Sequence, residues 1–204
     1  MKGLLRKDFY TLTRQLKLYL VLVAVFACMP GYSMSAFAIV YAAMLPFTAL
    51  AYDERAGWDV LAATMPLSRR QLVGSKYVLG LIACAAALIL SVAAEGIWAF
   101  VDASHSFRDG VEGLVSIAFL GPLMMSLTLP LMYRFGVEKG RLVFLGVVGL
   151  FVVGGGLLMN ALPKGVTGTE MGWGTFLLVA YGGTALLSVG SLLLSERLYR
   201  AGRR

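Results

Sequence analysis

Long apolar runs constrain this chain more than any other feature of its sequence. From Tyr77 to Val101, Glu95 is the only charged residue in 25 positions. A helix needs about 20 apolar residues to cross a hydrocarbon core about 30 Å thick. The chain is 59% hydrophobic with a mean hydropathy of +0.80, and its 14% of charged residues is well below the roughly 25% of a soluble domain. We therefore predict an all-α integral membrane protein with a single transmembrane domain, residues 1–204.

Six apolar segments reach or approach the length of a membrane span. They are residues 18–29, 33–51, 77–101, 114–132, 142–159 and 176–194. Pro30 and Gly31 make the turn between the first two. Because the first segment is short, a second interpretation stays open, in which the first two segments form a re-entrant pair.

The basic residues predict how these six transmembrane helices are oriented. Six spans would place the two termini and the segments 52–76 and 133–141 on the same side of the membrane. These four regions hold 16 of the 18 Lys and Arg residues. Arg108 and Lys164 fall on the other side. An excess of Lys and Arg marks the cytoplasmic side, so both termini are predicted to be cytoplasmic. The net charge is +7, but the basic residues flank apolar runs and are not gathered in one polar domain. This distribution argues against nucleic acid as a partner.

The N-terminal segment, residues 1–17, has the pattern of an amphipathic helix lying in the membrane interface. Its apolar stripe and basic flank include Leu5, Phe9, Leu12, Leu16, Arg6 and Lys17. Two interpretations remain open from the sequence: an anchor that sets the angle of the first span, and an elbow that transmits movement.

The segment 52–72, between the second and third spans, holds six charged side chains. Asp53 and Glu54 suit the start of a short helix. The residues that then recur at helical spacing are Trp58, Leu61, Ala62 and Met65. Pro66 ends this helix, because the residue before a proline avoids the helical region.

Ser68 and Gln71 form a capping box that starts the next helix. The segment is therefore predicted to be two ordered helices separated by a proline, although a turn alone needs only a few residues. One interpretation is a helix floating at the headgroups with Trp58 as an interfacial aromatic. The other is a rigid helix on which a cytoplasmic partner docks.

The sequence disfavours an enzyme. It contains no Gly-x-x-x-x-Gly-Lys-Ser/Thr loop that would cradle phosphates, so ATP hydrolysis by this chain alone is not expected. His105 is the one histidine, and Cys28 and Cys84 both lie in apolar runs, where they are expected to be inert. We predict neither catalytic residues nor a metal site.

Glu95 lies about 18 residues, or roughly 27 Å of helix, beyond Tyr77 and thus near the outer end of its span. It continues a stripe of small residues, Ala87 and Ser91, at intervals of four. Such stripes allow close helix packing. Two interpretations remain open: a carboxylate that reaches outer water, or a pathway lined by Ser91 and Glu95.

Residues 1–17 and 44–80 resemble the small permease subunits of ABC-2 type exporters. The resemblance rests on LLRKDFY near the N-terminus and on DER, Trp58 and TMPLSRRQLVGSKY between the second and third spans. Within that class, the chain most resembles the half-size permeases of bacterial phenol-soluble-modulin and antimicrobial-peptide exporters. Beyond residue 80, only the layout of spans agrees.

The resemblance implies a permease half in the bacterial cytoplasmic membrane, which pairs with a second copy or a paralogue and with cytoplasmic ABC ATPase subunits. Residues 1–17 would be its elbow helix and residues 53–65 its coupling helix, seated in a groove of the ATPase. The coupling residues would include Asp53, Glu54, Arg55, Trp58, Asp59, Leu61 and Met65. The chain itself would bind no cofactor, since ATP and Mg²⁺ belong to the ATPase. Besides membrane lipid, its ligand would be an amphipathic peptide or similar amphiphile.

Two other functions fit a chain of this size. A substrate-binding membrane subunit of a vitamin importer would bind a small vitamin tightly in a deep outer pocket. A membrane protein without a transport role, such as an immunity or assembly factor, would have no ATPase partner. The 52–76 segment favours the exporter permease over both.

Overall fold

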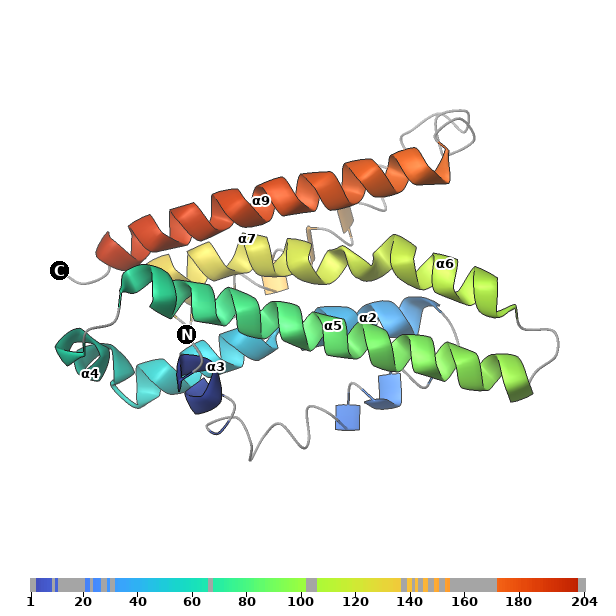
Figure 1. The fold of residues 1–204 in the computed structure, drawn as a ribbon. Coiled ribbons are helices and arrows are strands. Elements are labelled where there is room, and N and C mark those ends of the chain that lie inside the picture. Colours follow the sequence, from blue (N-terminus) through green and yellow to red (C-terminus); the bar gives the residue numbers. More distant parts are fainter. Residues whose placement is uncertain are drawn as a thin grey trace.

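Helices and short turns make up the part of the chain that the structure describes, and none of those residues lies in a strand (Figure 1). The computed structural model describes residues 3–8, 10, 21–22, 24–26, 29, 32–65, 68–101, 106–136, 139–140, 142, 145–146, 149–150, 153–154 and 172–201. Its labelled helices are α2 (Tyr32–Ala42), α3 (Leu45–Arg55), α4 (Trp58–Thr64), α5 (Arg69–Val101), α6 (Phe107–Ala118), α7 (Leu120–Phe135) and α9 (Trp173–Ala201). Residues 3–8 are also helical.

Four stretches of the described helices are long and apolar enough to cross a membrane. They are Ser35–Arg55, Arg69–Val101, Phe107–Phe135 and Trp173–Tyr199. They correspond to the predicted spans 33–51, 77–101, 114–132 and 176–194. Half of the predicted span 18–29 and more than half of 142–159 lie outside the described residues, so the total of six spans stays a prediction.

The predicted span 33–51 is two helices, because its chain turns at Ala43 and Met44 before α3 begins. Pro46 lies in the first turn of α3. A proline has no N–H to donate and its ring crowds the preceding turn, so a helix starts there more easily than it continues through. The break within this span therefore lies at Pro46.

The central helix of the bundle is α5, which contacts α2, α3, α6, α7 and α9. Its buried face carries Val73 and Tyr77, which pack with Phe47 of α3 and Leu129 of α7 in the largest core cluster. Further along α5, Ala87 packs against the alanine-rich face of α2. Small side chains there let the two helices approach closely.

Hydroxyl groups connect α9 to α5 and α7 inside the bundle. The Tyr77 hydroxyl lies 2.6 Å from Ser191 Oγ and 2.9 Å from Ser195 Oγ. Ser188 Oγ lies 2.8 Å from Ser126 Oγ, and Ser191 Oγ donates to the Ser126 carbonyl at 2.5 Å. We call these five residues the hydroxyl row. Each hydroxyl of the row has a partner in surroundings where water is scarce.

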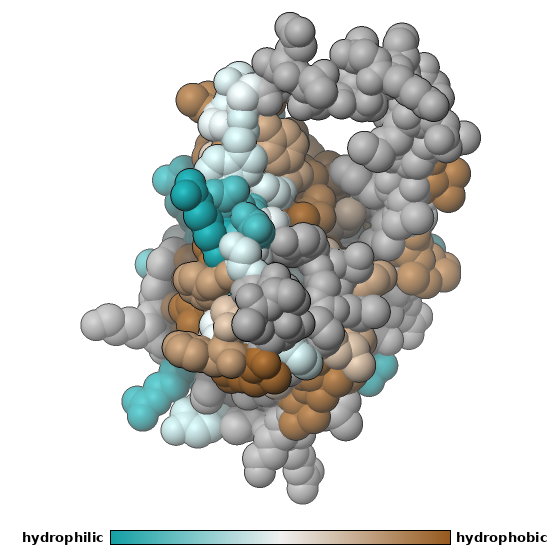
Figure 2. All heavy atoms as spheres, turned by 90° about the vertical axis from the view of Figure 1, so that its right-hand side faces the viewer, coloured by the Kyte–Doolittle hydropathy of each residue, from teal (hydrophilic) through white to brown (hydrophobic). Residues whose placement is uncertain are grey.

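Several chain segments meet at one end of the bundle, which we call the α4 end. Residues 3–8, α4, the start of α5 and the end of α9 all lie there (Figure 1). Figure 2 looks onto the opposite end, where the coloured surface is mostly hydrophobic around a small hydrophilic patch. The start of α6 lies at that opposite end, with Arg108 paired to Glu112.

Close packing at Gly121 of α7 gives a stability test. A Cβ atom at this position would lie 2.9 Å from both Cys84 Sγ and Ile39 Cγ2, short side chains with little room to move. We expect Gly121→Ala to destabilise the fold by about 1–3 kcal/mol, the usual effect of overpacking. Thermal unfolding in detergent measures it. Gly183→Ala is the matched control, because nothing lies within 4 Å of a Cβ there. An equal loss in both variants would contradict the packing argument.

Candidate functional site

Gly57 separates α3 from α4 with a left-handed backbone, φ 62° and ψ 27°, which any other residue adopts only with strain. The short helix α4 then runs from Trp58 to Thr64 and ends at Met65, whose extended backbone suits the residue before Pro66. The predicted helix–proline–helix order is confirmed. The capping box is confirmed as well, since the Ser68 and Gln71 side chains each accept the other's backbone N–H at 3.3 Å.

One boundary was predicted wrongly. Asp53, Glu54 and Arg55 do not start the short helix; they are the last turn of α3. The helix α3 begins only at the proline break, at Leu45, and its backbone hydrogen bonds continue as far as the turn at Ala56. Asp53, Glu54 and Arg55 therefore complete α3. The expected coupling helix 53–65 is therefore the end of α3 followed by α4.

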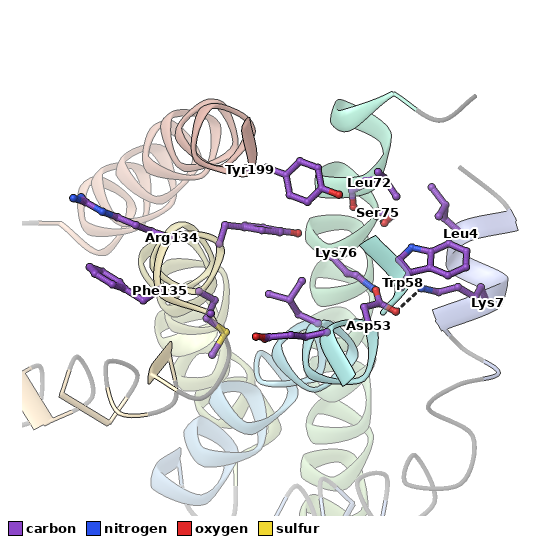
Figure 3. Close-up of a pocket in the computed structure, with 15 residues that line it drawn as sticks. Leu4, Lys7, Asp53, Trp58, Leu72, Ser75, Lys76, Arg134, Phe135 and Tyr199 are labelled. Atoms are coloured by element: carbon purple, nitrogen blue, oxygen red, sulfur yellow. Dashed lines mark hydrogen bonds and ion pairs between the residues drawn. The ribbon is translucent and has the colours of Figure 1, made fainter. Parts of the chain in front are cut away.

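Buried charges join three segments at this boundary (Figure 3). Lys76 Nζ of α5 lies 2.7 Å from Asp8 Oδ1 and 2.6 Å from Asp53 Oδ2. Lys7 Nζ lies 2.5 Å from Asp53 Oδ1 and 3.1 Å from Asp8 Oδ1. We call these four residues the charge network: Lys7, Asp8, Asp53 and Lys76.

The charge network is well shielded from solvent. Side-chain exposure is 2% for Asp8, 5% for Lys76, 11% for Asp53 and 23% for Lys7. Removing a charge from water costs several kcal/mol unless an opposite charge lies close by. Two lysines and two aspartates cancel formally, and each lysine contacts both carboxylates. The network thus holds residues 3–8, the end of α3 and the start of α5 together.

Lys7 extends this connection to α4. Its Nζ lies 4.0 Å from the centroid of the Trp58 ring, within the range of a cation–π contact. Trp58 is the first residue of α4 and is half-buried. Lys7 therefore connects the first residue of α4 both to the helical residues 3–8 and to the charge network.

The outer side of α4 is apolar and open. Leu61 is 51% exposed and Met65 is 39% exposed, and they lie one helical turn apart. Ala62 faces inward, with 3% exposure. Two exposed apolar side chains one turn apart form a small apolar surface, which suits either a protein partner or the membrane interface.

A cavity of about 390 Å³ lies beside the charge network (Figure 3). One wall comes from Leu50, Trp58 and Leu72, and the facing wall from α7 and α9 through Tyr133 and Tyr199. These two tyrosine rings contact edge to face at 5.9 Å. The cavity therefore lies between the elements joined by the network and the ends of α7 and α9.

The predicted coupling residues divide into two groups. Asp53 is buried in the charge network, while the side chains of Glu54, Arg55, Leu61 and Met65 are exposed. The side chain of Asp59 lies outside the described residues. Asp53 is thus placed to fix the helix rather than to meet a partner.

The predicted elbow residues are described only in part. Leu5 packs against Ala49 and Leu79, and Arg6 is exposed. Phe9, Leu12, Leu16 and Lys17 lie outside the described residues. The helical residues 3–8 thus rest on the bundle itself, through Leu5 and the charge network.

Ser91 and Glu95 are both buried inside the bundle, with 0% and 4% exposure. Glu95 lies against Gly110 of α6, where an added Cβ would come within 2.6 Å of its Oε2. In the described part of this single chain, Glu95 therefore contributes to packing between α5 and α6, while Ser91 lies on the buried face of α5. The same part contains no group of three or more His, Cys, Asp or Glu residues that could hold a metal ion.

The charge network includes residues that the sequence did not single out. Asp8 was missed, and Lys7 and Lys76 were counted only as basic residues at the membrane edge. A signal was present: Asp8 is the only acidic residue before Asp53. A lone acidic residue in a basic segment points to a specific partner.

Breaking the charge network on one side tests its structural role. We expect Lys76→Met to destabilise the fold by about 3–5 kcal/mol, because two buried carboxylates then share one lysine. Adding Asp8→Asn should restore part of the loss, since the remaining charges balance. Thermal unfolding in detergent follows both. The control is Arg70→Met, which breaks an exposed pair with Glu196 and should cost less than about 1 kcal/mol. If the double variant were no more stable than Lys76→Met, charge balance would not be what the site requires.

Comparison with known proteins agrees with this architecture. The family model described as ABC-2 family transporter protein matches residues 3–200, almost the whole chain. No curated protein sequence matches the chain well enough to count as a relative. The matched region includes all four described spans, the charge network and α4. The chain is a multi-pass membrane protein and belongs to the ABC-2 family of transporter proteins.

Proposed function

We propose that this chain is the permease half of an ATP-driven exporter and that α4 is the helix through which a separate cytoplasmic ATPase moves it. The observation that carries the proposal is the pairing of two features in α4. Its outer side exposes Leu61 and Met65, while its base is fixed by Lys7 and Trp58. A surface that only touched headgroups would not need such a fixed base.

The contacts define a path for mechanical force. Force on α4 reaches Trp58, then Lys7, and from there the carboxylates of Asp8 and Asp53. Both carboxylates hold Lys76 near the start of α5, a helix of 33 residues. A push on α4 would therefore act on the long central helix directly. The cavity of about 390 Å³ gives these elements room to move toward α7 and α9.

The rest of the proposal follows from membership of the family and from the resemblance of the sequence. Two permease chains, identical or paralogous, would form the transport unit with two ATPase subunits that bind ATP and Mg²⁺. The α4 end would face the cytoplasm of a bacterium, in agreement with the basic residues gathered there. The cargo would be an amphipathic peptide or a similar amphiphile, taken from the cytoplasm or the inner leaflet.

Docking through α4 can be tested with the ABC ATPase that co-purifies with the wild-type chain from its native membranes. We expect Leu61→Ala with Met65→Ala to weaken association by at least about tenfold, because two large apolar side chains lose their contact area. Co-purification from membranes measures the effect. The control is Leu178→Ala with Leu187→Ala, two leucines of α9 that are 75% and 49% exposed. If the α4 variant folds and associates like the wild type, the docking role of α4 is wrong.

Transmission can be separated from docking at Trp58. The change Trp58→Leu keeps an apolar side chain but removes the ring beneath Lys7. We expect the ATPase to remain bound while its hydrolysis no longer drives transport at the normal rate, since the contact between α4 and the charge network is weakened. Transport per ATP hydrolysed in reconstituted vesicles is the measurement. Normal transport in this variant would show that force takes another route.

A further inference from the structure

A groove of about 430 Å³ lies between the start of α5 and the end of α9, apart from the cavity beside the charge network. Its lining consists of Arg69, Arg70, Leu193, Glu196 and Arg197. The two arginines of α5 are the first residues of that helix, and Arg197 lies near the end of α9. We call it the basic groove.

The basic groove has an excess of positive charge. Three guanidinium groups share it with one carboxylate, which leaves a formal charge of +2. The carboxylate of Glu196 accepts from Arg70 Nε at 3.0 Å. Arg69 and Arg197 are exposed. Guanidinium groups bind phosphate oxygens with paired, well-directed hydrogen bonds, so the groove suits a phosphate-bearing anion.

An apolar stripe leads out of the basic groove along α9. Leu186, Val189 and Leu193 follow at intervals of three and four residues on one face, and Arg197 comes next on that face. Their exposure is 77%, 62% and 48%. The three apolar residues cover about 10 Å of helix, most of the roughly 15 Å that one leaflet contributes to the hydrocarbon core.

Charge at one end and an exposed apolar stripe in line with it match the shape of a phospholipid. A soluble phosphate would use only the arginines, and an acidic protein surface would not reach along the stripe into the hydrocarbon. A zwitterionic headgroup brings its own ammonium, which the excess of guanidinium groups repels. Basic pockets between transmembrane helices are known to favour anionic headgroups.

We propose that the basic groove is a binding site for an anionic phospholipid, with the phosphate between Arg69 and Arg197 and an acyl chain along Leu193, Val189 and Leu186. The lipid bridges α5 and α9 at the α4 end, where Arg70 and Glu196 are the only direct ion pair between these two helices among the described residues. Glu196 limits the positive charge of the site and fixes Arg70 in place.

The test uses the purified full chain in detergent and native mass spectrometry. It is titrated with phosphatidylglycerol and, separately, with phosphatidylcholine of the same acyl chains. We expect Arg69→Gln with Arg197→Gln to bind phosphatidylglycerol at least about tenfold more weakly, with no change for phosphatidylcholine. The control is Arg55→Gln with Arg134→Gln, two exposed arginines at the same end that lie outside the basic groove. This control should bind phosphatidylglycerol like the wild type.

Two further arms identify the ligand. Leu193→Asn should weaken phosphatidylglycerol while all three arginines remain, and glycerol 3-phosphate should fail to compete at the lipid's concentration. An equal loss in the control variant would mean general attraction to anions and would overturn the site. Competition by glycerol 3-phosphate would mean a soluble phosphate ligand. If Arg69→Gln with Arg197→Gln binds phosphatidylglycerol normally but no longer co-purifies with the ATPase, the groove serves a protein partner. Each of these three results overturns the proposal.

Discussion

Burying a charged side chain in a membrane protein is costly unless opposite charges lie close by, and this cost arranges the α4 end of the bundle. Lys76 belongs to a helix that crosses the membrane, while Asp8 and Asp53 come from two segments far from it in sequence. Each lysine touches both carboxylates, so moving any one segment away would leave charge unbalanced. The N-terminal helix, the end of α3 and the start of α5 consequently behave as one body.

This body explains why a helix as short as α4 has a defined position. Seven residues form barely two turns, too few for a stable isolated helix in water. Gly57 lets the chain turn away from α3, and the contact between Lys7 and Trp58 fixes the first residue of α4. The turn at Gly57 and the contact between Lys7 and Trp58 together leave Leu61 and Met65 facing outward. Such a rigid projection suits the proposed docking of a separate ATPase on α4.

Local chemistry made much of the fold predictable from sequence. The apolar runs predicted the described spans, and Ser68 with Gln71 predicted the start of α5. All of these depend on neighbours within a few residues. The same reasoning failed for Asp53, because an acidic residue suits a helix start only where nothing else determines its place.

The charge network and the basic groove could not be predicted in the same way. Asp8 and Lys76 are 68 positions apart, and Arg70 and Glu196 are 126 apart. No periodicity connects such residues, and only the packing of the helices brings them together. One signal of the charge network was present in the composition of the N-terminal segment, residues 1–17, which has one carboxylate and five basic residues. That pattern indicates a partner without indicating which one.

The hydroxyl row restricts one motion of α9 more than another. Ser191 and Ser195 are one turn apart, and the Tyr77 hydroxyl lies within hydrogen-bond distance of both. A slide of α9 by one turn, about 5.4 Å, in either direction would still leave a serine beside Tyr77. A rotation of α9 about its own axis would carry both serines away and leave a buried hydroxyl without them. The row therefore fixes which face of α9 meets α5 more firmly than it fixes the height of α9 in the membrane.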